Sequence, residues 1–313
     1  MKLALPAHAR PHLEGRLPPG AEARWYGASQ EAVAAVEGAE VGWLDILGPP
    51  GPAEVIEAGK DLRWVTTALA GVNSFPLARL RERGLPLTNG AGVNAIPVAE
   101  FAIMGMLALA KNLRELIRLQ DRREWPSRAP GDGELYGSKA LIVGYGSIGR
   151  EIGARLKAMG VEVTGVRRTP GGEPGVIGPD GWRPRLGEFD WIVLASAATP
   201  ETDRMIGGAE LAAMKPSAFI VNIARGGLID QPALIAAATA GRIAGAFLDV
   251  TDPEPPPTDD PIWSTPGIVM TCHTSGRSQT RMSERAAVLF LDNLERWREG
   301  RPLRNLVDLE LGY

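Results

Sequence analysis

From residue 140 onward, short apolar runs alternate with stretches that have helical periodicity. This alternation is typical of βαβ units, which build a parallel sheet. Six apolar runs predict six strands, enough for a doubly wound nucleotide-binding domain. We place the strands at 140–144, 161–166, 191–195, 218–223, 244–250 and 268–271. Helices are expected at 147–159, 208–214 and 232–240, and loops at the Pro/Gly-rich segments 169–184 and 252–261.

The first 95 residues carry a looser version of the same pattern. Strands over residues 1–6, 41–47 and 63–69, with helices between them, predict a smaller α/β domain. One long helix is expected over 97–119, with proline in its first turn, and a last helix over about 281–298. We therefore expect two Rossmann-like domains. One is a doubly wound parallel sheet over 96–283, and the other is a smaller flavodoxin-like domain formed by 1–95 with 284–313.

Composition narrows the class of protein. The 313 residues are 44% hydrophobic and 23% charged, which excludes a disordered, collagen-like or coiled-coil chain. The net charge of −3 provides no basic field, so we expect no nucleic-acid partner and no anionic membrane surface. The longest apolar run, 101–110, is half of the ~20 residues that span a bilayer. With one cysteine and three histidines, we expect a cytoplasmic protein without disulfides or a metal site.

A glycine-rich motif follows the first strand of the larger domain. Gly144, Gly146 and Gly149 form the pattern G-x-G-x-x-G between an apolar strand and a helix. The first glycine permits a tight turn, the second lets the backbone approach a pyrophosphate, and the third allows close helix–strand packing. Ser147 and Ile148 open the helix whose N-terminus faces the anion. The motif predicts a dinucleotide site, and the alternative is a glycine-rich turn without a ligand.

The end of the second strand bears on the choice of cofactor. About 20 residues after the first glycine, this motif normally has an Asp or Glu that binds the adenine ribose. Arg167 and Arg168 stand at that point instead, and no carboxylate is available there. A guanidinium pairs well with a 2′-phosphate, so the sequence favours NADP over NAD. The alternatives are NAD as the cofactor, or two arginines that are simply solvated loop charges.

Three further segments, each at a predicted strand end, carry a family resemblance. They contain Arg225, Glu254 and His273 respectively, and they occur in this order after the glycine motif. Together they resemble the D-isomer-specific 2-hydroxyacid dehydrogenases over residues 64 to 300. The matching segments are 221–230, 247–255 and 270–274, and also 70–73, 94–100, 199–202 and 260–263.

The resemblance implies roles for three side chains in the reduction of a 2-oxo acid. Arg225 holds the carboxylate and carbonyl of the substrate, His273 is the acid/base, and Glu254 orients and charges the histidine. Hydride transfer to a ketone leaves negative charge on oxygen, so a proton donor and a cation there stabilise the transition state. Without its companion motifs, His273 would be interpreted as a structural histidine.

The resemblance implies further site residues as well. Backbone amides around Ala70, Gly71 and Val72 bind the substrate carboxylate. Ala224 and Asp249 belong to the cofactor site, where Asp249 bonds the nicotinamide carboxamide. The alternative for Asp249 is a cap at the end of a strand.

Two residues depart from the family pattern. Asn73 stands where the family often has Asp, and Cys272 stands where proline commonly precedes the histidine. Neither change removes a catalytic group. We interpret the thiol beside His273 as a packing residue, with oxidation sensitivity as the alternative.

We therefore expect an NADPH-dependent 2-oxo acid reductase, most similar in outline to the glyoxylate/hydroxypyruvate reductases of the family. The resemblance also implies a homodimer through the helix over 98–119. The chain ends soon after the last helix, so we expect no regulatory C-terminal domain of the kind that many phosphoglycerate dehydrogenases carry. Two alternatives stay open: a corepressor-like protein that senses NAD(P), and an NAD-linked dehydrogenase of a bulkier 2-hydroxy acid.

Overall fold

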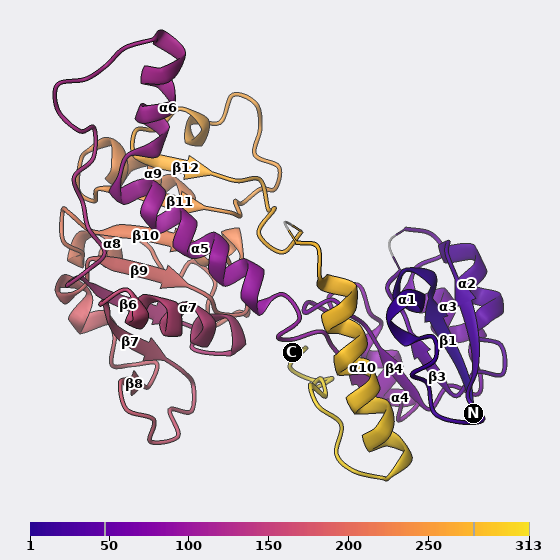
Figure 1. Ribbon diagram of the computed structural model, residues 1–313. Helices are drawn as coiled ribbons and strands as arrows, with labels where there is room; N and C mark the ends of the chain where they lie inside the picture. The colour runs from indigo at the N-terminus through magenta and orange to yellow at the C-terminus, as the bar shows by residue number, and fades with distance from the viewer. Residues whose placement is uncertain (47, 278, 313) are drawn as a thin grey trace. The chain divides into compact units, whose positions relative to one another are not determined.

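Two α/β units make up the chain, and the computed structural model describes residues 1–46, 48–277 and 279–312 of it. Met1–Asn94 and Gln279–Tyr313 form the first unit, and Ala95–Ser278 forms the second (Figure 1). The expected boundaries, after residues 95 and 283, lie one and five residues further along the chain. Each unit has its own sheet and its own core, and each is described by itself.

The second unit is built on a seven-stranded sheet in which every pairing is parallel. Its order is β12-β11-β10-β9-β6-β7-β8. The chain adds β7 and β8 on one side of β6 and the later strands on the other side, so the strand order reverses between β6 and β9. Open α/β sheets bind ligands beyond the carboxyl ends of the strands at such a point. The strands are β6 (Lys139–Val143), β7 (Glu162–Val166), β8 (Val176–Ile177), β9 (Trp191–Leu194), β10 (Phe219–Asn222), β11 (Gly245–Leu248) and β12 (Ile268–Met270).

Helices cover both faces of this sheet because successive side chains of each strand point to opposite faces. Ile142 of β6 packs in the core beneath α5 and α7, whereas its neighbour Leu141 packs in the core beneath α8 and α9. Both residues are fully buried, as continuous apolar strands of a parallel sheet require. The helices are α5 (Ala95–Ala110), α6 (Leu113–Arg122), α7 (Ser147–Ala158), α8 (Gly208–Ala213) and α9 (Gln231–Thr239), with 3₁₀ turns η2 (Arg183–Glu188), η3 (Gly226–Leu228) and η4 (Pro261–Trp263).

The prediction of one long helix over 97–119 is wrong. The segment forms α5 and α6, which meet at an angle of 63°. Asn112 lies between them with φ of +47°, a left-handed conformation that ends a helix and that asparagine tolerates better than most residues. The apolar periodicity continues through the break, so the pattern does not reveal it. In the described part of the chain no single helix is long and apolar enough to cross a membrane, and only α5 and α6 taken together reach that length and composition.

The prediction of a continuous loop over 169–184 is also incomplete. β8 adds an edge strand there, with the Arg167 amide donating to the carbonyl of Ile177 at 3.0 Å. The two residues of β8 are too few to show a periodicity.

The first unit has a five-stranded parallel sheet in the order β2-β1-β3-β4-β5, which is the flavodoxin-like order. The two strand orders confirm the predicted fold class. The pattern missed β2 and β5, and the expected strand over 41–47 ends at Trp43, while Leu47 lies outside the described residues. The strands are β1 (Lys2–Pro6), β2 (Glu22–Tyr26), β3 (Val41–Trp43), β4 (Trp64–Thr66) and β5 (Leu87–Thr88).

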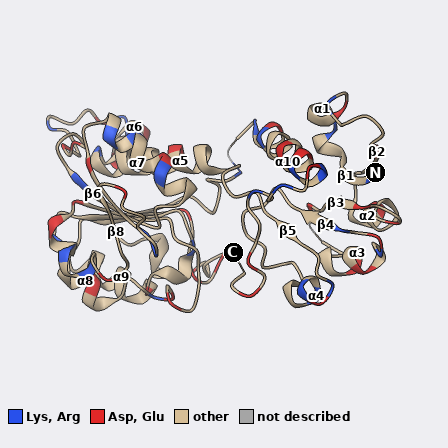
Figure 2. Ribbon diagram, turned by 90° about the horizontal axis from the view of Figure 1, so that it is seen from below, with Lys and Arg blue, Asp and Glu red and all other residues tan. Residues whose placement is uncertain are grey.

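The last helix, α10 (Met282–Arg298), belongs to the first unit and closes one face of its sheet. Phe290 of α10 lies against Trp43 and Trp64, with ring centroids 5.1 and 5.7 Å apart. The remaining helices are η1 (Ala7–Ala9), α1 (Arg10–Leu13), α2 (Ser29–Ala35), α3 (Pro52–Ala58) and α4 (Leu77–Glu82). Basic and acidic residues are interspersed over the helices of both units (Figure 2). The absence of a nucleic-acid partner stays a prediction.

Candidate active site

The glycine motif follows β6 at the carboxyl edge of the larger sheet. Gly144 has φ of +99°, and a β-carbon there would lie 2.4 Å from the backbone nitrogen of Ser196. Only glycine fits this position. A β-carbon at Gly149 would lie 2.3 Å from the carbonyl oxygen of Gly144, so α7 packs directly on the turn. The two glycines therefore act as the motif predicts, one in the turn and one in the helix contact.

The N-terminus of α7 carries the groups that bind a pyrophosphate. Gly146 is the N-cap of α7, and a β-carbon on it would meet no described atom within 4 Å. A glycine N-cap has no side chain to accept hydrogen bonds from the first-turn amides, which include those of Ser147 and Ile148. These amides and the positive end of the helix dipole are the groups that bind phosphate in dinucleotide sites. The residues present thus fit a nicotinamide dinucleotide.

Arginines gather beside the motif. Arg167 and Arg168 follow β7 and are exposed. Arg150, in the first turn of α7, pairs with Glu173 at 2.7 Å and lies over the Tyr145 ring. The hydrogen bond from Arg150 holds the pKa of Glu173 below its usual range against a smaller effect of desolvation, and the charge of Arg167 acts in the same direction. Positive and negative side chains thus lie together beside the motif, and the choice of NADP over NAD stays a prediction.

The three residues with predicted catalytic roles follow three neighbouring strands. Arg225 comes after β10, Glu254 after β11 and His273 after β12, on the same edge of the sheet as the glycine motif. The structure pairs two of them, because Nδ1 of His273 lies 2.7 Å from Oε1 of Glu254. Both side chains are partly exposed, at 44% and 38%. Because Nδ1 contacts Glu254, Nε2 is the ring atom that remains to contact a ligand.

The turn that carries His273 has an uncommon backbone. Cys272 and His273 have φ of +53° and +52°, a region that non-glycine residues rarely occupy. Arg277 holds both peptide groups, since its Nε donates to the His273 carbonyl at 3.0 Å and its Nη2 to the Cys272 carbonyl at 3.2 Å. Strained residues of this kind persist only where surrounding contacts hold them, often at functional sites. No signal in the sequence marks Arg277, because only the folded turn brings its side chain back to those carbonyls.

Asp249 also holds the turn that carries His273. The residue as a whole is 2% exposed. Oδ1 accepts hydrogen bonds from the Thr271 hydroxyl and the Thr274 amide, both at 2.9 Å. Oδ2 accepts from the hydroxyl and amide of Ser275, at 2.5 and 3.2 Å. This is the strand-end role that the sequence analysis gave as the alternative. The carboxamide contact of Asp249 stays a prediction.

The turn that carries Arg225 is held by Asn222, which is fully buried. Its Nδ2 donates to the Arg225 carbonyl at 2.8 Å, and its Oδ1 accepts from the Ala224 amide at 3.1 Å. A β-carbon on Gly226 would lie 1.9 Å from the Thr251 carbonyl oxygen, so the turn lies directly against the loop that leads to Glu254. The sequence signal for Asn222 is a single amide at the end of an apolar strand, which the sequence analysis did not use.

The predicted substrate loop, residues 70–72, lies in the first unit at the carboxyl end of β4. Asp45 fixes the start of this loop, because its Oδ1 accepts from the Thr67 hydroxyl and the Ala68 amide, both at 2.8 Å. Asn89 fixes the next part by donating to the carbonyl of Ala70 at 2.8 Å. The backbone amides of the loop are therefore presented by an ordered segment.

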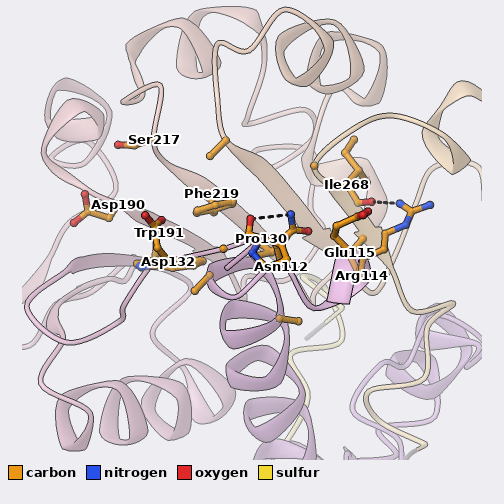
Figure 3. Close-up of a pocket in the computed structure, with 18 of the residues that line it drawn as sticks. Asn112, Arg114, Glu115, Pro130, Asp132, Asp190, Trp191, Ser217, Phe219 and Ile268 are labelled. Carbon is orange, nitrogen blue, oxygen red and sulfur yellow. Dashed lines mark hydrogen bonds between the residues drawn. The ribbon is translucent and has the colours of Figure 1, made fainter. Parts of the chain in front are cut away.

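A cavity of about 860 Å³ lies at the opposite edge of the larger sheet (Figure 3). Its lining includes Asp190 before β9 and Ser217 before β10. The break between α5 and α6 forms another part of the wall, where Arg114 donates to the carbonyl of Ile268 at 2.9 Å. All the predicted site residues are described, and none of them lines this cavity. Over the described ranges no cluster of three metal-ligating side chains occurs either.

Known proteins match both the sequence and the fold. Residues 103–275 match the family model described as D-isomer specific 2-hydroxyacid dehydrogenase, NAD binding domain. A glyoxylate reductase of Korarchaeum cryptofilum is 33% identical over 86% of this chain and 82% of that protein. A D-isomer specific 2-hydroxyacid dehydrogenase from Xanthobacter autotrophicus, solved with NADPH and MES, is 25% identical, covers 100% of this chain and 99% of its own, and has a TM-score of 0.81.

Some relatives are much longer. A D-3-phosphoglycerate dehydrogenase of Archaeoglobus fulgidus is 32% identical over 82% of this chain, which corresponds to 49% of that protein. The chain thus spans about half the length of such relatives.

Proposed function

Because the chain belongs to the D-isomer specific 2-hydroxyacid dehydrogenase family, we propose that it reduces a small 2-oxo acid with NADPH. The substrate we propose is of the glyoxylate or hydroxypyruvate type, and the product a D-2-hydroxy acid. The observation that carries this proposal is the 2.7 Å Glu254–His273 pair, which lies at the same sheet edge as Arg225 and the glycine motif. Family membership accounts for the oxidoreductase class, whereas the substrate and the preferred cofactor are proposed.

His273 is the proton donor in this proposal. Its Nδ1 faces Glu254, so Nε2 is the atom that reaches the carbonyl oxygen of the substrate. Glu254 fixes the plane of the ring and stabilises the protonated form that donates. Arg225 binds the carboxylate and carbonyl oxygens, and its positive charge stabilises the charge that develops on the carbonyl oxygen. The nicotinamide cofactor, when bound, supplies the hydride.

The remaining predicted contacts complete the proposal. Gly144, Gly146 and Gly149 with the N-terminus of α7 hold the pyrophosphate, and Arg167 and Arg168 bind the 2′-phosphate. The solved neighbours include an NADPH complex and an NAD complex, so the choice of NADPH over NADH rests on the two arginines. Ala224 and Asp249 line the nicotinamide end of the site, and the amides of residues 70–72 bind the substrate carboxylate.

The experiment that tests the proposal is a comparison of kcat/KM for glyoxylate and hydroxypyruvate with NADPH and NADH. We expect NADPH to be preferred by about tenfold or more, which corresponds to about 1.4 kcal/mol. Arg167→Asp should remove that margin, and His273→Asn should remove turnover while leaving NADPH binding intact. If neither acid is reduced although NADPH binds, the small-acid substrate is wrong, and a bulkier 2-oxo acid or a sensor function replaces it.

We also propose that the protein is a homodimer joined through α5 and α6. Large apolar side chains are exposed along this segment, and Trp125, just after α6, is 98% exposed. Patches of this kind mark interaction surfaces in soluble proteins. The exposed residues include Met104, Leu107, Leu113, Leu116, Ile117 and Trp125.

Sedimentation equilibrium tests the dimer. We expect a dimer for the wild type and a monomer for Ile117→Asp. Val288→Asp is the control, because it places the same charge at an exposed apolar position in the other unit, on α10. A monomeric wild type would disprove the interface.

A further inference from the structure

One ion pair bridges the two loops on either side of the glycine motif. Arg168 follows β7, and Glu201 lies in the loop after β9. Both strands are direct neighbours of β6, which ends in the motif. Nη2 of Arg168 lies 2.6 Å from Oε2 of Glu201, so the pair crosses from one flank of the motif to the other.

We propose that Glu201 is a specificity-determining residue that competes with the 2′-phosphate of the cofactor for Arg168. This inference rests on the proposed use of NADPH. A carboxylate and a phosphate bind a guanidinium through the same type of charge-assisted hydrogen bond, so one group can replace the other. NADH carries no phosphate at that position and leaves the pair unchanged. Glu201 thereby weakens NADPH binding and leaves NADH binding as it is.

The loop presents Glu201 in a defined position. The Thr202 hydroxyl accepts from the Thr199 amide at 2.8 Å and donates to the Ala197 carbonyl at 2.8 Å. The residue next to Glu201 is therefore tied to the start of its own loop. The Glu201 carboxylate thus contacts Arg168 from a turn that is held by these hydrogen bonds.

The exposure of the pair makes the exchange feasible. The side chains of Arg168 and Glu201 are 58% and 73% exposed, so solvent screens their attraction. Exposed pairs of this kind change an equilibrium by about two- to fivefold. A phosphate that carries up to two negative charges attracts the same guanidinium more strongly than one carboxylate does. The phosphate can thus displace Glu201. Breaking the Arg168–Glu201 pair costs free energy, and this cost lowers the affinity of the protein for NADPH.

Calorimetric titration of the full chain with adenosine 2′,5′-bisphosphate and with 5′-AMP tests the proposal. These probes differ only in the 2′-phosphate, and neither requires turnover. For Glu201→Gln we expect the Kd of the bisphosphate to fall about two- to fivefold at low salt and that of 5′-AMP to stay unchanged. Glu188→Gln is the matched control, because it removes the same charge from an exposed pair with Arg185 in the same unit.

A second variant isolates the competition. In an Arg168→Gln background, Glu201→Gln should have no effect on the bisphosphate, because the contested group is gone. The proposal is wrong if Glu201→Gln leaves the bisphosphate Kd unchanged, tightens both probes equally, or still acts without Arg168. It is also wrong if the wild type does not bind the bisphosphate. If the pattern holds but no 2-oxo acid is reduced, the proposed function fails and the role of Glu201 stands.

Discussion

Replacing Asp249 by asparagine should loosen the turn that carries His273. The substitution keeps the shape of the side chain and its Oδ1, but it removes the charge and places an amide nitrogen at Oδ2. Three donors reach Oδ1: the Thr271 hydroxyl, the Thr274 amide and the Ser275 amide, at 2.9, 2.9 and 3.3 Å. The Ser275 hydroxyl at Oδ2 can rotate and accept from the new amide nitrogen. The Ser275 amide, which is shared between Oδ1 and Oδ2, would keep only its contact with Oδ1.

The magnitude follows from these contacts. A hydrogen bond to a charged group contributes about 1.5–3 kcal/mol and a neutral one about 0.5–1.5 kcal/mol. Each of the three bonds to Oδ1 therefore weakens by about 1 kcal/mol, and the bond with the Ser275 hydroxyl weakens by a similar amount because it becomes a neutral one. Asp249→Asn should thus lower the free energy of unfolding by about 4 kcal/mol. For a unit of this size, a loss of 1 kcal/mol lowers Tm by about 2–4 °C, and we expect a decrease of about 8–16 °C.

The assay combines thermal unfolding with steady-state kinetics. We expect kcat to fall about tenfold or more, because a displaced histidine is a poor proton donor. Thr271→Val is the control, since it removes one of the three bonds and should cost about 1.5 kcal/mol. An unchanged Tm in Asp249→Asn would refute the anchoring role. An unchanged Tm together with a weaker Kd for NADPH would instead favour the predicted contact with the nicotinamide carboxamide.

Three further substitutions probe the site. Glu254→Gln should lower kcat about 10²-fold with little change in the KM of the 2-oxo acid, and an unchanged kcat would show that His273 works without the carboxylate. Gly226→Ala should destabilise the protein by about 1–3 kcal/mol in urea unfolding, because its β-carbon would lie 1.9 Å from a backbone oxygen; Gly208→Ala, where the space is open, is the control. Asp45→Ala should raise the KM of the 2-oxo acid several-fold without changing the Kd of NADPH, and a KM equal to that of the wild type would argue against a substrate role for residues 70–72.

Much of the fold was readable in the sequence because its signals are local. Continuous apolar runs such as 140–143 and 218–221 mark strands buried on both faces of a parallel sheet, and the glycine spacing after Val143 predicts the turn that the structure contains. The break at Asn112 and the two-residue β8 were missed, because one left-handed residue or two edge residues leave no periodic signal.

The sequence also indicated some residues of the site, whereas others were found only in the folded structure. The family resemblance of three motifs pointed to Arg225, Glu254 and His273. Each of these residues follows a strand of the same parallel sheet, and the carboxyl ends of parallel strands share one edge. Only the tertiary structure decided what supports them: Arg277 on the carbonyls of the histidine turn, and Asp249 beneath it. It also paired Arg168 with Glu201, 33 residues away. Such contacts depend on how the fold places loops from different strands next to one another, and no local pattern of residues predicts that placement.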